Sequence, residues 1–152
     1  MDATLDKMLC FSLYAASRAM TAAYGPVLEP LGLTYPQYLV MLLLWERDGQ
    51  SVTELGDQLQ LDSGTLTPLL KKLEAAGVLV KARDEADARV VRVRLTAQGK
   101  ALRKKAASVP HSILCLSGLK ITELARLREE LKSLTTTLRE ANASSKHQEH
   151  AS

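Results

Sequence analysis

Two cysteines are the residues of this chain best suited to chemistry of their own. Cys10 lies in the run Leu9-Cys10-Phe11-Ser12-Leu13-Tyr14, and Cys115 follows 105 residues later. A cysteine thiolate can attack a peroxide oxygen, whereas a cysteine on an apolar helix is often only a small buried hydrophobic residue. Two cysteines in 152 residues do not form a disulfide scaffold, which favours a reducing compartment.

A second group of residues suits contacts with nucleic acid. Ser63, Thr65 and Thr67 carry hydroxyls that both donate and accept hydrogen bonds, and Lys71 and Lys72 suit phosphates. Between positions 71 and 105 there are 11 lysines and arginines against 4 acids, so this segment carries +7 and the remainder −4. Such a concentration predicts nucleic-acid binding, although a solvated basic face would have the same composition.

Acidic residues interrupt this basic segment between Arg83 and Arg89. Asp84, Glu85 and Asp87 are unfavourable neighbours for DNA phosphates. An aspartate two residues before an arginine can, however, orient the guanidinium as a probe for a minor groove. Arg83, Asp87 and Arg89 are therefore candidate DNA-binding residues.

The elements that position these residues follow from periodicity and capping patterns. Helical spacing and N-cap residues predict helices over 3–24, 34–47, 51–60, 62–76, 96–117 and 122–141, with capping boxes at Thr34–Gln37 and Ser51–Glu54. Gly25-Pro26 should end the first helix, Gly77 should end the fourth in the left-handed conformation, and Ser117-Gly118 should end the fifth, which breaks or kinks at Pro110. Alternation predicts strands over 78–83 and 89–95, joined as a hairpin. The fold class is therefore mainly α with a small β-hairpin wing, a winged helix-turn-helix in which the second short helix enters the major groove.

The last predicted helix carries leucines three and four residues apart. Such a seam indicates a helix–helix contact, either with a second copy or with the same domain. We favour a dimer, in which residues 1–141 form one domain: helices 3–24 and 97–141 dimerise, and 51–96 bind DNA. Residues 142–152 are predicted to be a flexible tail. The seam consists of Leu124, Leu127, Leu131, Leu134 and Leu138.

Other classes of protein lack support in the sequence. Asp2 and Asp6 stand where a signal peptide would be basic, and the longest apolar run, Leu39 to Trp45, is too short to cross a membrane. These features predict a cytoplasmic protein without membrane contact. His111 and Cys115 are one helical turn apart, but two ligands do not indicate a metal site. We expect neither a metal nor a cofactor.

The DNA-binding pattern resembles the MarR family, the multiple antibiotic resistance regulators. The resemblance rests on the run from Asp62 to Glu74, on Gly77, on Asp87-Ala88-Arg89 and on Leu95-Thr96, and it extends over about residues 5–140. It implies a triangular dimer built from the N- and C-terminal helices. Such a dimer binds double-stranded, pseudo-palindromic operator DNA with two recognition helices and two wings.

The surroundings of Cys10 resemble one branch of that family, the organic hydroperoxide resistance regulators of the two-cysteine type. Leu9-Cys10-Phe11 with Tyr14, Tyr24 and the run 33–38 carry the resemblance. It implies that Cys10 is the peroxidatic sensor, that Tyr24 and Tyr35 hydrogen-bond its sulfur across the dimer interface, and that Tyr14 lies near the site. The helix starting near Tyr35 would also stabilise a thiolate.

The same resemblance assigns a role to the second cysteine. It implies that Cys115 resolves the sulfenic acid of Cys10 as an intersubunit disulfide, which releases operator DNA and protects the sensor from over-oxidation. An organic hydroperoxide would be the inducer, and a cellular thiol would reduce the disulfide.

Three alternatives remain open from the sequence alone. The first is a repressor of the same family that is released by a small phenolic or aromatic ligand in the dimer cleft, with Cys10 incidental. The second is an enzyme, a thiol peroxidase, although no oxyanion or cofactor motif is visible and the basic wing would be unexplained. The third is a nucleoid protein that binds DNA without sequence preference.

Overall fold

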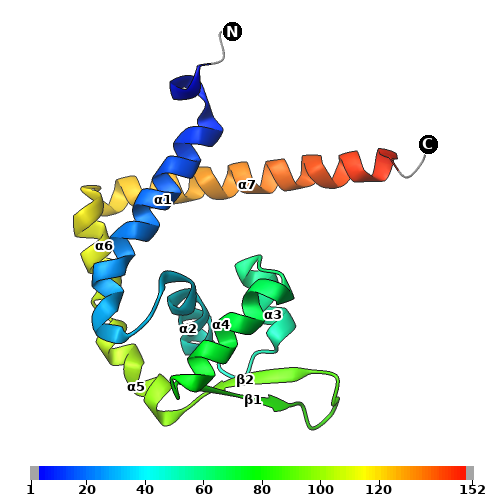
Figure 1. Ribbon diagram of the computed structural model, residues 1–152. Helices are drawn as coiled ribbons and strands as arrows, with labels where there is room; N and C mark the ends of the chain where they lie inside the picture. The colour runs from blue at the N-terminus through cyan, green and yellow to red at the C-terminus, as the bar shows by residue number, and fades with distance from the viewer. Residues whose placement is uncertain (1–3, 150–152) are drawn as a thin grey trace. The chain divides into compact units, whose positions relative to one another are not determined.

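The computed structural model describes residues 4–149 of the chain and shows a mainly helical protein with one hairpin (Figure 1). The chain divides into two compact units, Met1–Ile113 and Leu114–Ser152. In chain order, the elements are η1 (Leu5–Lys7), α1 (Leu9–Leu28), η2 (Glu29–Leu31), α2 (Tyr35–Glu46), α3 (Val52–Leu59), α4 (Ser63–Ala75), β1 (Leu79–Arg83), β2 (Val91–Leu95), α5 (Ala97–Ala106), α6 (Val109–Ser117) and α7 (Ile121–Glu149).

Local capping explains where α2 and α3 begin. Thr34 and Gln37 form a capping box at α2, in which the Gln37 side chain accepts the Thr34 N–H at 2.9 Å. Ser51 and Glu54 form the equivalent box at α3, with 2.7 Å from the Ser51 N–H to Glu54 Oε2. Each box satisfies N–H groups that the first helical turn leaves without partners. Both capping patterns read from the sequence are therefore confirmed.

A leucine-rich core holds α2, α3 and α4 against the hairpin. Fully buried side chains come from every one of these elements, and each contributes about 1.5–3 kcal/mol relative to exposure. This core fixes the helix-turn-helix unit as a rigid platform. Its members with almost no exposed surface include Met41, Leu44, Leu55, Leu66, Leu70, Leu73, Leu79 and Val93.

The hairpin is antiparallel, with Leu79 opposite Leu95 and Arg83 opposite Val91. Gly77, at a φ of 73°, ends the preceding helix in the left-handed conformation expected from the sequence. Where the hairpin returns to the helices, Trp45 Nε1 donates to the carbonyl oxygen of Gly99 at 2.8 Å in a buried hydrogen bond. This bond fixes the first turn of α5, which directly follows the wing, to α2, while the loop of the wing extends beyond the helices (Figure 1).

Three predicted helix boundaries are wrong. The first helix does not stop at Gly25-Pro26 but continues to Leu28, and its predicted start is replaced by η1 and an extended Met8, with residue 3 outside the described part. Gly25 has no Cβ to clash with the proline ring, and a proline so near the helix end removes only one hydrogen bond. The last helix continues beyond Ala141 to Glu149, because residues 142–149 contain no glycine or proline to end it.

The break expected near Pro110 is confirmed. The chain leaves α5 after Ala106 and begins α6 at Val109, so that Pro110 stands in the first helical turn. A proline is tolerated there, since its missing N–H would have no partner in that turn. Gly118, at a φ of 68°, follows the end of α6 as expected.

Within the described residues, no single helix is long and apolar enough to cross a membrane. One pair of segments, Leu9–Leu31 and Tyr35–Glu46, reaches the required length and apolarity only when the two are taken together, and they are bent by 68° at the break between them.

Candidate nucleic-acid interface and cysteine site

The second helix of the helix-turn-helix, α4, separates a buried face from an exposed one. Leu66, Leu70 and Leu73 are buried in the core. The five residues predicted to meet DNA are all exposed, and helical spacing divides them into two neighbouring rows on the outer face. The first row is Ser63, Thr67 and Lys71, and the second is Thr65 and Lys72.

At the tip of the wing, the carboxylate of Asp87 forms a salt bridge with the guanidinium of Arg89. Arg89 Nε donates to Asp87 Oδ1 at 3.1 Å and Nη2 donates to Oδ2 at 3.0 Å, a bidentate pair. These hydrogen bonds hold the pKa of Asp87 below its ordinary value, and Asp87 raises the pKa of Arg89. The Arg89 side chain is nevertheless 91% exposed. The contact between Asp87 and Arg89 that their spacing predicted is therefore present, and it holds the charged guanidinium of Arg89 in one orientation toward solvent.

Between the recognition helix and the wing lies a hollow of about 300 Å³. Thr67 and Leu70 of α4 line one side, and Lys81 and Arg89 of the hairpin line the other. Lys81 is also held by Glu74, with 3.2 Å between Nζ and Oε2. Hydroxyl and cationic side chains from two separate elements thus face one concave surface.

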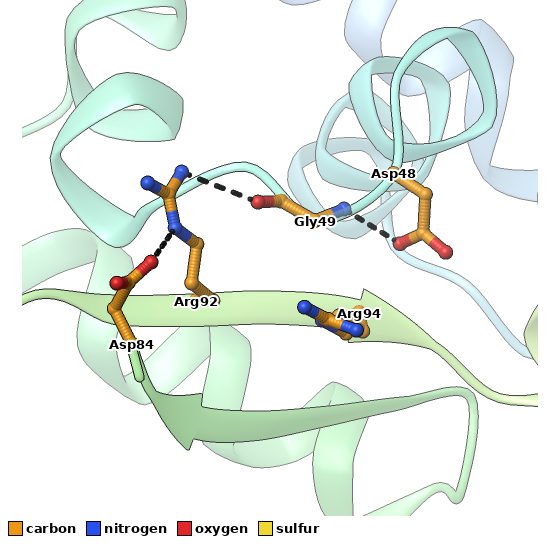
Figure 2. Close-up of a pocket in the computed structure, with 5 residues that line it drawn as sticks. All are labelled: Asp48, Gly49, Asp84, Arg92 and Arg94. Atoms are coloured by element: carbon orange, nitrogen blue, oxygen red, sulfur yellow. Dashed lines mark hydrogen bonds and ion pairs between the residues drawn. The ribbon is translucent and has the colours of Figure 1, made fainter. Parts of the chain in front are cut away.

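No local sequence pattern indicates which residues attach the wing to the helices. Arg92 of β2 donates to Asp84 and to the carbonyl oxygen of Gly49 (Figure 2). It also donates to Glu54 of α3. Alternation along β2 indicated only that Arg92 lies on the face opposite Val93. Its partners are 8, 38 and 43 residues away, so no local pattern could have identified them.

The tyrosines around the start of α2 form an aromatic cluster. The rings of Tyr24 and Tyr35 have centroids 4.7 Å apart, and Tyr38 lies 5.9 Å from Tyr24. Burial, followed by the neighbouring phenols, raises the pKa of Tyr24, and burial with Tyr35 does the same for Tyr38. These phenols stay neutral at physiological pH and keep their protons for donation. Tyr38, which the sequence did not single out as a site residue, also packs edge-on against Trp45.

Cys10 lies apart from the tyrosine cluster in the single chain. Cys10 is exposed near the start of α1, beside Leu9, which is 61% exposed; Cys115 is exposed on α6. Neither is the buried core cysteine of the alternative interpretation. Cys10 and Tyr24 share helix α1 and are 14 residues apart, which at 1.5 Å per residue is about 21 Å. Tyr14, one turn from Cys10, accepts a hydrogen bond from Arg18 at 3.0 Å.

The helix-turn-helix on its buried core, the exposed hydroxyls of α4 and the charged wing define a winged helix-turn-helix transcriptional regulator. The model of a family described as transcriptional regulator SarA/Rot matches residues 22–106. The organic hydroperoxide resistance transcriptional regulator of Bacillus subtilis (strain 168) is 47% identical over 138 residues, covering 91% of this chain and 94% of that protein.

Solved structures agree with this assignment. The structure of reduced AbfR bound to DNA matches this chain with a TM-score of 0.76 and 36% sequence identity, over 90% of this chain and 93% of the AbfR chain. A crystal structure of AbfR of Staphylococcus epidermidis is a further match. A MarR family regulator from Rhodococcus sp. RHA1 has a TM-score of 0.78 and 25% identity over 88% and 96% of the two chains. The chain belongs to the MarR family of transcriptional regulators and, within it, to the organic hydroperoxide resistance regulators.

Proposed function

We propose that the protein is a dimeric repressor that releases operator DNA when an organic hydroperoxide oxidises Cys10. The observation that carries this proposal is the exposed thiol of Cys10 near the start of α1, in a chain 47% identical to an organic hydroperoxide resistance regulator. The double-stranded operator, the second copy, the hydroperoxide and a cellular thiol reductant are its partners. The protein would act in the cytoplasm.

Exposed apolar side chains support the dimer. The first helical segment leaves Leu5, Leu9 and Phe11 at least 39% exposed, and α7 leaves Leu127 and Leu138 about half exposed. An obligate dimer covers well over about 1,200 Å² of largely apolar surface, which these helices are suited to supply. In the assembled dimer, residues 1–141 would act as one domain with helices 3–24 and 97–141 at the interface.

DNA binding would use both exposed faces described above. The hydroxyls of Ser63, Thr65 and Thr67 would meet base edges in the major groove, and Lys71 with Lys72 would bind phosphates. Arg89, oriented by Asp87, would enter the minor groove beside it, with Arg83 at the base of the wing loop. Arg83 Nη1 already donates to the carbonyl oxygen of Ala88 at 2.9 Å, so its proposed role includes shaping the loop.

Oxidation would proceed in two balanced steps. The Cys10 thiolate attacks the terminal oxygen of the hydroperoxide, the O–O bond breaks, and the remainder leaves as an alcohol after taking up a proton. The sulfenic acid of Cys10 then reacts with the thiol of the partner subunit's Cys115, forming a disulfide and releasing water. Two further thiols from the cell reduce that disulfide and restore the sensor.

The tyrosines that assist Cys10 would have to come from the other subunit. Tyr24 is about 21 Å along the same helix from Cys10, far beyond hydrogen-bond distance. Tyr24 and Tyr35 of the partner subunit can therefore donate to the sulfur only if the dimer brings the partner's tyrosine cluster beside Cys10. Tyr14 of the same chain is one turn from Cys10 and lies on the same side of the helix.

Release would follow from the geometry of a disulfide. Its two Cα atoms must lie within about 7 Å. If the reduced cysteines are farther apart, the helix bearing Cys115 has to move, and the break before Pro110 gives it a place to bend. That helix follows α5, which starts at the end of the wing after Thr96. Its movement would change the spacing of the two recognition helices.

The test uses a duplex selected from a random-sequence pool by the reduced protein. Reduced wild type should bind this duplex and cumene hydroperoxide should release it. Cys10→Ser should bind but ignore the oxidant, since a serine hydroxyl is not ionised at neutral pH. Cys115→Ser should still react and stop at a sulfenic acid or a mixed disulfide. Non-reducing gels should show a covalent dimer only for oxidised wild type.

One outcome would overturn the redox proposal. Release of Cys10→Ser by hydroperoxide would mean that the sensor is elsewhere. Release by a phenolic ligand without oxidant would then favour the ligand-responsive repressor of the same family. Catalytic turnover of hydroperoxide with a thiol would favour a peroxidase, and footprints without a preferred sequence would favour a nucleoid protein.

A further inference from the structure

One side chain, Arg92, joins the wing to two other segments of the domain, and Figure 2 shows its contacts with Asp84 and Gly49. Its Nε donates to Asp84 Oδ2 at 2.6 Å, at the start of the wing loop. Its Nη1 lies 3.3 Å from Oε2 of Glu54, in the first turn of α3, and 3.4 Å from the carbonyl oxygen of Gly49, in the turn before α3. The planar fork of a guanidinium suits such divergent contacts, which the single ammonium of a lysine could not all make.

Asp84 extends this attachment to the tip of the wing. Its other oxygen, Oδ1, accepts the backbone N–H groups of Ala86 at 2.9 Å and Asp87 at 3.2 Å. Asp87 in turn holds the guanidinium of Arg89 in a bidentate pair. A continuous series of hydrogen bonds therefore runs from α3 through Arg92 and Asp84 to the residue that is directed into solvent.

The charges around Arg92 are balanced within the protein. Arg92 lies between the carboxylates of Asp84 and Glu54, and Glu54 also pairs with Arg47 at 3.1 Å. The hydrogen bond from Arg92, followed by those from the loop N–H groups, holds the pKa of Asp84 below its ordinary value, so the carboxylate stays charged at neutral pH. An arginine already matched by two carboxylates is poorly suited to bind a phosphate as well.

We propose that Arg92 is a positioning residue that fixes the wing against α3, so that Arg89 and the recognition helix reach DNA in one set geometry. A two-stranded hairpin is only marginally stable on its own. The position of Arg89 at its tip therefore depends on how firmly the hairpin is held to the rest of the domain. This inference rests on the proposed function, because it requires the wing to contact DNA.

The test compares three variants of the full-length reduced protein on the selected duplex, with affinity measured at several salt concentrations. Arg92→Leu should weaken binding about ten-fold, a coupling within the range of contacting networks. The slope of log K against log salt should fall by less than the fall of about 1.8 expected for Arg89→Ala, because Arg89 keeps its charge but is less well placed. Arg92→Lys, which keeps the charge but not the fork, should be intermediate.

Arg94→Leu is the matched control, since it removes the same charge two residues along the same strand. Within the described residues its guanidinium has no hydrogen bond or ion pair. It should bind more tightly than Arg92→Leu, and any loss should come with a shallower salt slope. Equal losses with equal slopes for the two variants, or wild-type affinity for Arg92→Lys, would overturn the proposal.

A double-mutant cycle tests whether Arg92 acts through the wing tip. In an Arg89→Ala background, Arg92→Leu should cost much less than in wild type, because the residue it positions is absent. Additive losses would overturn the proposal while leaving wing contact intact. If Arg89→Ala alone has no effect, the proposed wing contact itself fails, which is a separate result. Hydrogen exchange of the amides of residues 84–91 should rise in Arg92→Leu, while that of α4 stays as in wild type.

Discussion

The pairing of Asp87 with Arg89 suggests a mutation that distinguishes two roles for an acidic residue at the tip of the wing. The direction of the change in DNA affinity on Asp87→Asn decides between them. If Asp87 merely repels phosphates, Asp87→Asn should tighten binding, since it removes a negative charge beside DNA. If Asp87 orients Arg89 through its two hydrogen bonds of 3.0 and 3.1 Å, the same substitution should weaken binding. We expect weaker binding, because the neutral amide cannot accept both guanidinium N–H groups.

The size of the effect is set by Arg89, which is 91% exposed and so loses little within the protein when truncated. One arginine contact is worth about ten-fold in affinity, so Arg89→Ala should cost a dimer about a hundred-fold at low salt. Each lost cation lowers the salt slope by about 0.9, or about 1.8 for two half-sites. The ratio of variant to wild-type Kd should therefore shrink about twelve-fold between 50 and 200 mM salt.

Fluorescence anisotropy of the selected duplex measures both quantities, with Lys104→Ala as the control. Lys104 is an exposed cation on α5, outside the proposed interface, and its loss should change affinity and slope little. Equal effects from Arg89→Ala and Lys104→Ala would mean that the DNA face has been placed wrongly. Tighter binding by Asp87→Asn would refute the orienting role alone.

Three further predictions concern the platform and the dimer. Trp45→Phe removes the buried hydrogen bond to Gly99 and should lower the free energy of unfolding by about 2 kcal/mol, measured in urea. Because the pKa values of Tyr24 and Tyr38 are raised in the folded protein, their contribution to stability is full below pH 10 and is lost as the pH rises through the raised pKa values. The fall in Tm above pH 10 should therefore be smaller in Tyr38→Phe than in wild type. An unchanged fall in Tm would contradict this role for Tyr38. Leu131→Glu places a charge in the leucine seam and should give monomers at micromolar concentration in sedimentation, whereas a persistent dimer would argue against the seam.

Local patterns predicted most of the fold because they act over a few residues. The capping boxes at Thr34 and Ser51 and the left-handed glycine at position 77 are each decided within one helical turn, and all three are present. The helix end predicted at Gly25-Pro26 is wrong. Helix α1 continues through these residues, because Gly25 has no Cβ to clash with the ring of Pro26.

Contacts between distant segments could not be predicted from the sequence, because they depend on the fold and not on a few neighbouring residues. The Asp87–Arg89 pair was predictable because its members are two residues apart, whereas Arg92 acquires its role only when the fold brings positions 49, 54 and 84 together. Sequence alternation gave the face on which Arg92 lies but not its partners. The same holds for Tyr38, whose contacts with Tyr24 and Trp45 depend on how α1 and α2 pack.

The geometry of α1 also constrains how sensing and assembly are related. Cys10 and Tyr24 share one helix and are held about 21 Å apart by its rise, so no movement within one intact helix can join them. If phenols activate the sulfur, they must be supplied by a second copy, and the sensor is then complete only in the dimer. A dimer is equally what a two-half-site operator requires. Under the proposed function, a substitution that separates the subunits should therefore abolish peroxide reactivity and operator binding together, even when it touches neither Cys10 nor the wing.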